Sequence, residues 1–155
     1  MVHPAVRLLA WIWTRLLNDD ARSWIMWWLN AKFAVGVTAI VRNDLGQVLF
    51  VEHAFRRRHR WALPGGWIQR KEGLEAAVVR ELAEETGLEV EVDRVLAATA
   101  YDLPRLDVAY LCRVRGGVLR GSVETPHLRW CTPHDLPPEA DPHSVELMRL
   151  GLEQR

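Results

Sequence analysis

The spacing of hydrophobic and polar residues changes near residue 33 and divides the chain into two parts. Upstream, residues 5–17 are apolar around nearly the whole circumference of a helix, with only a narrow polar stripe. Downstream, short β-branched runs alternate with turn residues, which is typical of strands. We therefore expect a helical extension over residues 1–32, followed by one domain over residues 33–155.

The N-terminal extension is rich in tryptophan. Five of the eight tryptophans of the chain lie there, at Trp11, Trp13, Trp24, Trp27 and Trp28. A second helix is expected to run through Trp28, with Asp19 or Asp20 as its N-cap. Neither apolar run approaches the roughly 20 residues that span a bilayer. The extension is therefore expected either to pack against the domain or a second copy, giving a homodimer, or to contact a membrane surface peripherally.

The domain is predicted to contain strands and two helices around a mixed sheet. Strands are expected at residues 33–41, 47–53, 89–102, 106–115 and 127–132, and helices at residues 74–86 and 144–153. The sequence Asn-Asp-Leu-Gly at residues 43–46 predicts a turn, so the first two strands should form a hairpin. Together these elements predict an α/β sandwich.

The helix expected at residues 74–86 carries three carboxylates on one side. At 100° per residue, Glu81, Glu84 and Glu85 fall within roughly 100° of one another. The opposite face, predicted to pack on the sheet, consists of Ala76, Val79, Leu82 and Ala83. Neighbouring carboxylates repel one another, and the usual compensation is a hard divalent cation, which prefers oxygen ligands. A solvated acidic helix face is the alternative.

Glycines and an arginine flank these carboxylates. Gly65 and Gly66 allow a tight loop before the helix, and Gly87 is placed to end the helix as a C-cap. Arg80 directly precedes the cluster and can either hold a glutamate in place or bind a phosphate oxygen. The glycines at both ends favour a metal site over a solvated face.

A basic segment precedes the glycines. It contains Arg56, Arg57, Arg58, His59 and Arg60. If this loop folds over the carboxylates, Arg56, Arg57 and Arg58 would hold the phosphate of an anionic substrate by bidentate contacts. Otherwise it is a solvated basic loop. Trp61 and Trp67, which follow it, could each stack on a base or pack in the interior.

Composition limits the classes of partner. The chain has 20 basic and 20 acidic residues, so its formal net charge of zero predicts no bulk attraction to nucleic acid or to an anionic membrane. Its 155 residues suffice for one domain with a proper core. Cys112 and Cys131 lack the spacing of a metal site and are too few for a disulfide framework. We expect both to be buried in strands of a cytoplasmic protein.

The helix and the loop before it resemble the Nudix box. Every fixed position of that pattern is filled, by Gly66, Glu72, Arg80, Glu81, Leu82, Glu84, Glu85, Gly87 and Leu88. The resemblance extends over about residues 33–155, through the hairpin, the LPGGW segment and the RW…DLP ending. It implies an α/β/α sandwich that hydrolyses a nucleoside diphosphate linked to another group, using Mg²⁺ or Mn²⁺.

The resemblance also implies a set of metal ligands. By similarity, Glu84 and Glu85 would be ligands, and Glu81 would be a ligand or the base that activates water. The carbonyl of Gly65 matches a backbone ligand of the family. Glu124, six residues before Trp130, matches a distal glutamate that some members use as a further ligand or as the base.

Two further residues of the box would have supporting roles by similarity. Arg80 would orient the glutamates, and Glu72 would tie the loop to the helix. One position departs from the family, because a glycine often precedes the first glutamate of the box. Here that residue is Lys71, with Gly73 on the other side, so the conformation of the loop is open.

The predicted activity is therefore metal-dependent hydrolysis of a nucleoside diphosphate derivative. Pro104, 16 residues beyond the box, resembles a feature of members that act on ADP-ribose. ADP-ribose or a nucleotide sugar ranks first as substrate, oxidised or ordinary nucleoside triphosphates second, and RNA 5′ ends third, with no other nucleic-acid partner expected. The alternative is a non-catalytic Nudix module that senses a nucleotide or mediates protein association.

Overall fold

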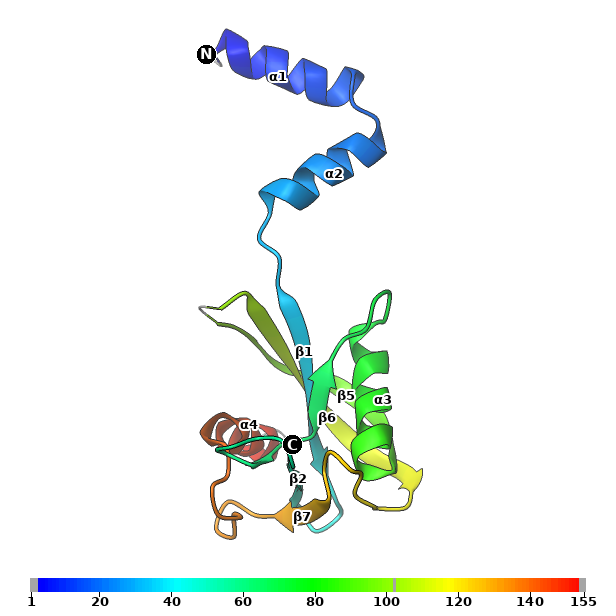
Figure 1. The fold of residues 1–155 in the computed structure, drawn as a ribbon, viewed down its shortest axis with the longest axis vertical. Coiled ribbons are helices and arrows are strands. Elements are labelled where there is room, and N and C mark those ends of the chain that lie inside the picture. Colours follow the sequence, from blue (N-terminus) through cyan, green and yellow to red (C-terminus); the bar gives the residue numbers. More distant parts are fainter. Residues whose placement is uncertain (1–2, 102, 154–155) are drawn as a thin grey trace. The chain divides into compact units, whose positions relative to one another are not determined.

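The computed structural model describes residues 3–101 and 103–153. Contacts between residues divide the chain after Phe33 into an N-terminal unit and a larger domain (Figure 1). Asp102, which the sequence places at the end of a strand, lies outside the described residues.

The N-terminal unit consists of two helices, α1 (Pro4–Arg15) and α2 (Asp19–Leu29). Arg22 joins them, because its Nε donates to the carbonyl of Trp13 at 2.8 Å and its Nη2 to that of Thr14 at 3.0 Å. These are carbonyls at the end of α1 that have no partner within the helix. No residue of either helix is buried, and neither helix of this described unit has the length of a membrane span.

The N-cap of α2 is Asn18, so the prediction of Asp19 or Asp20 was wrong. The Oδ1 atom of Asn18 accepts a hydrogen bond of 2.8 Å from the backbone nitrogen of Ala21. The two aspartates lie in the first turn instead, where the positive end of the helix dipole favours their charge. The sequence offered three consecutive capping residues, and the chain uses the first.

The domain is built on a seven-stranded mixed sheet. Its strands are β1 (Ala34–Arg42), β2 (Val48–Glu52), β3 (Trp61–Ala62), β4 (Gly65–Trp67), β5 (Leu88–Ala100), β6 (Arg105–Gly117) and β7 (His127–Cys131). The order is β3-β2-β1-β6-β5, with β4 paired to β1 and β7 paired to β2. Only β1 and β6 pair in parallel among these strands, and the mixed sheet predicted from the sequence is confirmed. The short strands β3 and β4 were not predicted.

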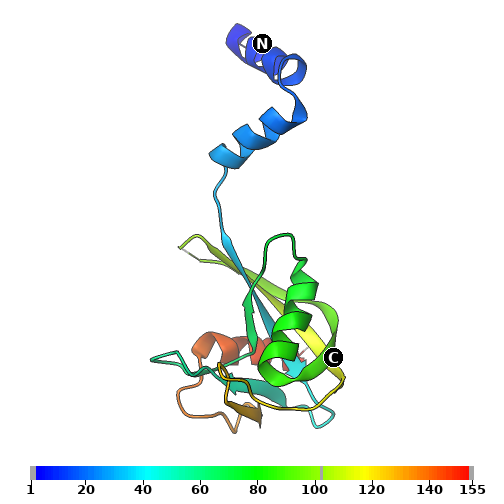
Figure 2. The ribbon, with the colours of Figure 1, turned by 45° about the vertical axis from the view of Figure 1, so that its right-hand side comes forward.

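Helices α3 (Leu74–Thr86) and α4 (Pro142–Glu153) pack on opposite faces of the sheet (Figures 1 and 2). Alternate residues of β1 point to the two sides. Val37 contributes to the cluster that includes Leu82 of α3, whereas Ile40 contributes to the cluster that includes Met148 of α4. The domain is therefore the α/β/α sandwich that the sequence predicts.

Of the four residues predicted to form the buried face of α3, only Leu82 is buried. The observed buried face consists of Ala77, Val78, Leu82, Glu85 and Thr86. Ala76, Val79 and Ala83 are exposed. The error came from assuming that the carboxylates and the packed face are opposite each other. Glu85 lies less than one turn from Leu82, so its carboxylate points toward the sheet and its loops.

The loop before α3 takes the conformation that a glycine would provide. Lys71 has a φ of 67°, in the left-handed region. This arrangement lets the backbone nitrogen of Glu72 donate to the carbonyl of Gln69 at 3.1 Å. At the other end of the helix, Gly87 has a φ of 70° and donates to the carbonyl of Ala83, which confirms the predicted C-cap.

Lys71→Gly is expected to stabilise the domain. Backbone strain from a side chain in the left-handed region destabilises the folded state by about 1–2 kcal/mol, and glycine would remove this strain. Glycine also has a higher conformational entropy in the unfolded chain, which offsets about 0.5–1 kcal/mol of that stabilisation. The free energy of unfolding should rise by up to about 1 kcal/mol in denaturant titration. Arg70→Gly, at the neighbouring exposed position, should lower it. Equal effects of the two substitutions would contradict the role assigned to the φ of Lys71.

Candidate active site

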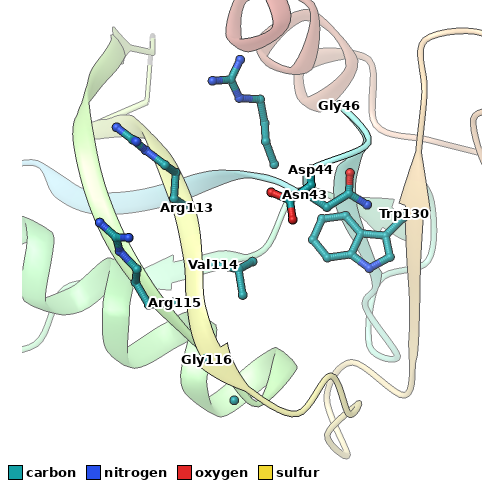
Figure 3. A pocket seen from close by; sticks show the side chains of 10 residues that line it. Asn43, Asp44, Gly46, Arg113, Val114, Arg115, Gly116 and Trp130 are labelled. Atoms are coloured by element: carbon teal, nitrogen blue, oxygen red, sulfur yellow. The ribbon is translucent and has the colours of Figure 1, made fainter.

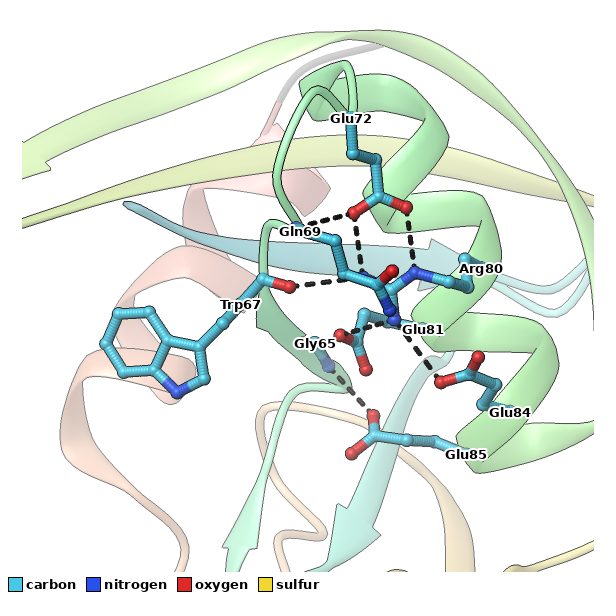
Figure 4. A network of polar contacts seen from close by, with 8 residues as sticks. All are labelled: Gly65, Trp67, Gln69, Glu72, Arg80, Glu81, Glu84 and Glu85. Atoms are coloured by element: carbon cyan, nitrogen blue, oxygen red, sulfur yellow. Dashed lines mark hydrogen bonds and ion pairs between the residues drawn. The ribbon is translucent and has the colours of Figure 1, made fainter. Parts of the chain in front are cut away.

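Helix α3 and strand β4 bring the box residues together (Figure 4). Glu85 is buried, with 7% of its surface exposed, and its Oε2 accepts a hydrogen bond of 2.9 Å from the backbone nitrogen of Gly65. Glu81 is half-buried and Glu84 is exposed. The carboxylates therefore range from interior to solvent along one side of the helix.

Arg80 links the helix to the loop before it. Its guanidinium donates to the two carboxylate oxygens of Glu72 at 2.8 and 2.9 Å, to the carbonyl of Trp67 at 3.1 Å, to Glu81 at 2.8 Å and to Glu84 at 3.3 Å. The hydrogen bonds with Glu72 raise the pKa of Arg80 and lower the pKa of Glu72 to about 2. Both groups are therefore charged throughout the physiological range, and the arginine fixes the positions of two box glutamates.

Two glycines of β4 make close contacts. A Cβ atom on Gly66 would lie 2.4 Å from the carboxyl group of Glu81, so a side chain there would displace that carboxylate from its present position. A Cβ atom on Gly65 would lie 2.1 Å from the carbonyl oxygen of Val37, across the β1–β4 pair. The backbone of β4 thus passes directly beneath the carboxylates.

The environment of Glu85 disfavours its negative charge. Burial, together with the smaller effects of the nearby carboxylates of Glu81 and Glu124, raises the pKa of Glu85 to about 7. The hydrogen bond from Gly65 and the positive charge of Arg56 oppose this shift without cancelling it. A buried carboxylate surrounded by like charges is a place where a cation would be stabilised.

The loop containing Glu124 is attached to the same place. The hydroxyl of Thr125 donates to the backbone carbonyl of Glu85 at 2.7 Å, and the carbonyl of Glu124 accepts from the nitrogen of Ala54 at 2.8 Å. The side chain of Glu124 itself is exposed. The distal glutamate chosen by its distance from Trp130 in the sequence therefore lies beside the box helix.

The donor atoms suit a hard divalent cation. Carboxylate oxygens and the carbonyl of Gly65 are the ligands that Mg²⁺ and Mn²⁺ prefer. Among the described residues, no three His, Cys, Asp or Glu side chains converge as a ligand group. Glu81 and Glu84 point to Arg80 instead (Figure 4). The residues thus fit such an ion in the chemistry of their donor atoms.

His53 lies next to Glu85 and was not singled out from the sequence. Its Nδ1 is 3.8 Å from Oε1 of Glu85, and its buried Nε2 has no hydrogen-bond partner among the described residues. Burial, followed by the charge of Arg56, lowers the pKa of His53 to about 4, so the imidazole is neutral at pH 7. A single histidine at the end of a strand gives no signal in the sequence.

A cleft adjoins the carboxylates on the other side of β4. Its narrow part, of about 140 Å³, is lined by Gly66, Trp67 and Arg105 among others, and the wider part, of about 370 Å³, reaches Tyr101 and His143. The guanidinium carbon of Arg105 lies 4.9 Å from the ring centre of Trp67 and 5.4 Å from that of Tyr101. The cleft therefore offers aromatic rings and a cation beside the box.

Strand pairing explains why this cleft was missed in the sequence. Gly36 of β1 pairs with Trp67 of β4 on one edge and with Asp107 of β6 on the other. Asp107 accepts from Arg105 at 2.8 Å and so holds the guanidinium in place. Residues about forty positions apart become neighbours through one row of the sheet.

Of the four residues predicted to bind substrate, only Arg56 lines the cleft. Arg56 lines both parts of the cleft. Arg57 and Arg58 are exposed, with no ion pair or hydrogen bond to the described residues. Trp61 packs against the core cluster on the α4 side, and its carbonyl accepts from the nitrogen of Asp141 at 2.7 Å. The structure thus brings Arg56, and not its basic neighbours, to the site.

A groove of about 720 Å³ lies elsewhere in the domain (Figure 3). It is formed at the ends of β1 and β6 and bordered by Trp130. Two of its arginines are engaged with acidic side chains of β5, since Arg113 pairs with Asp93 and Arg115 pairs with Glu91. No residue of the Nudix box lines this groove.

Comparisons with known proteins agree with this fold and site. The NUDIX domain family matches residues 32–150. A MutT-like protein of Streptomyces ambofaciens is 36% identical over 105 residues, which cover 66% of each chain. An RNA pyrophosphohydrolase of Ectopseudomonas mendocina is 39% identical over 77 residues, or 47% of each chain. The matched part is less than two thirds of the length of either relative.

A solved structure is also similar. The crystal structure of an ADP-ribose pyrophosphatase from Streptococcus suis has a TM-score of 0.67 and 30% identity, covering 77% of this chain and 90% of that one. The fold and the box define a Nudix-type α/β/α sandwich. The chain belongs to the Nudix hydrolase family.

Glu85→Gln is expected to stabilise the metal-free protein at alkaline pH. The pKa of Glu85 is raised from an ordinary 4.5 to about 7, so the folded state holds a proton that the unfolded state releases. The free energy of unfolding should therefore fall as the pH rises from about 4.5 to about 7. The glutamine variant should escape this fall and be more stable at pH 8 by on the order of 2 kcal/mol.

The measurement is denaturant unfolding in chelator at pH 4.5 and pH 8. Glu89→Gln, an exposed position on β5, serves as the matched control and should follow the wild type. A glutamine variant that loses stability in parallel with the wild type would contradict the assigned burial effect.

Proposed function

We propose that this chain is a divalent-metal-dependent pyrophosphohydrolase of nucleoside diphosphates linked to another group. The observation that carries the proposal is the burial of Glu85 among other carboxylates, held by the backbone of Gly65. Such an arrangement is unfavourable by itself and becomes favourable when a cation is present. The complete box and the adjoining cleft supply the other groups that the reaction requires.

The ion, Mg²⁺ or Mn²⁺, would be held by the carbonyl of Gly65 and by carboxylates of Glu81, Glu84, Glu85 and Glu124. When bound, it supplies positive charge against the phosphate oxygens and makes the attacking water more acidic. The proton acceptor is a carboxylate, a role for which Glu81 and Glu124 are the two candidates. General-base assistance of this kind contributes roughly 10²–10⁴-fold to the rate.

Arg80 has a positioning role in this proposal. It holds Glu81 and Glu84 through the same guanidinium and is itself fixed by Glu72. The shared positive charge of the arginine offsets part of the repulsion between these two glutamates. Arg56, at the mouth of the cleft, is placed to bind a phosphate of the substrate.

ADP-ribose or a nucleotide sugar is the proposed substrate class. Support comes from the likeness to the ADP-ribose pyrophosphatase and from the cleft, where Trp67 and Tyr101 offer rings for a base or sugar. Nucleoside triphosphates are ranked next. The likeness to an RNA pyrophosphohydrolase makes a 5′-triphosphorylated RNA a necessary comparison substrate.

Hydrolysis of a panel containing ADP-ribose, nucleotide sugars, nucleoside triphosphates and 5′-triphosphorylated RNA tests the proposal. With Mg²⁺ or Mn²⁺, we expect wild-type turnover of a diphosphate derivative and a loss of at least roughly 100-fold in kcat for Glu85→Gln. Glu89→Gln should retain wild-type turnover. Full activity of Glu85→Gln would contradict the ligand assignment, and binding of a nucleotide without any turnover would favour the sensing module.

Trp67→Ala is expected to weaken substrate binding more than chemistry. The ring of Trp67 is half exposed and faces the cleft, where stacking on a base is worth roughly 1–3 kcal/mol. The KM of the preferred substrate should rise about tenfold or more, with little change in kcat. Trp24→Ala, at a similarly exposed tryptophan of the N-terminal unit, should leave both constants unchanged. A fall in kcat alone would contradict a binding role for Trp67.

A further inference from the structure

The N-terminal unit exposes an unusual amount of apolar surface. Its exposed large hydrophobic residues are Val6, Leu8, Leu9, Trp11, Leu16, Trp24, Met26, Trp27, Trp28, Leu29 and Phe33. Trp24 and Trp28 are 64% and 60% exposed. Within described residues 3–33, no helical residue is buried. Large apolar patches of this kind mark surfaces that bind a partner.

The apolar surface of α1 is too broad for one helical partner. When the residues of α1 are placed around the helix axis at 100° per residue, they form one uninterrupted apolar arc of about 200°. The two edges of this arc are Leu8 and Ala10. A helix that packs on a protein surface buries a stripe of roughly 100°. An environment that surrounds most of the helix, such as the acyl-chain boundary of a bilayer, covers the wider arc.

Polar groups at the corner between the two N-terminal helices have partners within the unit. The hydroxyl of Thr14 donates to the carbonyl of Ala10 at 2.8 Å. Arg22 donates to the carbonyls of Trp13 and Thr14 and to Asp19, so its charge and the last carbonyls of α1 have partners. A polar group that moves from water into lipid loses its hydrogen bonds to water, and lipid offers none in return. Because the groups at the corner between the helices bond to one another, they avoid this free-energy cost.

The tryptophans of α2 form a cluster with a cation. The ring of Trp28 makes edge contacts with Trp24 and Trp27, at centroid distances of 5.9 and 5.4 Å. The ammonium of Lys32 lies 4.4 Å from the ring centre of Trp27. Tryptophan beside lysine is the combination found at the headgroup level of a membrane.

Charge distinguishes the partner further. The unit has four basic residues, Arg7, Arg15, Arg22 and Lys32, against two acidic residues, Asp19 and Asp20. Such a balance opposes self-association and favours an anionic surface. In the described chain, no helix is long and apolar enough to cross a membrane.

We propose that residues 3–33 bind the surface of an anionic phospholipid bilayer, with α1 and the tryptophans of α2 at its interface.

Flotation of the full chain with vesicles tests this proposal. We expect the protein to float with vesicles of equal parts phosphatidylcholine and phosphatidylglycerol, and to float less with phosphatidylcholine alone. Replacing Trp24, Trp27 and Trp28 by alanine should weaken binding to the anionic vesicles roughly tenfold or more. The double variant Arg7→Gln and Arg15→Gln should weaken it roughly tenfold, with little effect on neutral vesicles.

Leu45→Ser and Val123→Ser together provide the matched control, because both residues are highly exposed apolar residues of the domain. This variant should float like the wild type, and all variants should show the thermal unfolding of the domain unchanged. Absence of flotation by the wild type, or an equal loss in the control, would overturn the proposal. A second result would also overturn the proposal: light scattering that shows a wild-type dimer and a monomeric tryptophan variant, together with no binding of the wild type to vesicles.

Discussion

Burial of a carboxylate against strand β4 is the constraint on which the site depends. Glu85 is in the interior, where its charge is unfavourable, and among the described residues the backbone nitrogen of Gly65 is its one direct hydrogen-bond donor. Keeping it there requires a helix whose glutamates face the sheet and a strand without side chains beneath them. It also requires a fixed loop between the two, which the bond of Arg80 to Glu72 provides.

This geometry separates binding from chemistry. The carboxylates lie on one side of β4, and the cleft with Trp67 and Arg105 lies on the other. Since β4 is only three residues long, the two are adjacent without sharing side chains. Under the proposed function, cleft residues can change to suit another base or sugar while the box stays the same. This arrangement suits a family whose members act on many nucleotide derivatives.

The domain and the N-terminal unit follow different rules. The sheet buries its apolar residues between α3 and α4, whereas the two N-terminal helices bury none of theirs within the described residues. A helical segment with hydrogen-bonded polar groups at its corner and exposed tryptophans is stabilised when a membrane interface covers its apolar surface. The proposed hydrolase would thus act beside a lipid surface, while its catalytic groups remain within the sandwich.

Local sequence determined the elements other than the short strands β3 and β4, and it determined the identity of the box, because periodicity, capping glycines and the order Arg80-Glu81 operate over a few residues. It could not determine the packed face of α3, since Ala76 and Val79 are as apolar as the residues that are buried. Nor could it predict that Arg105 lies beside Trp67 or that Trp61 packs against the core. Those outcomes depend on the parallel pairing of β1 with β6 and on β4 beside β1, contacts between distant residues that only the tertiary structure decides.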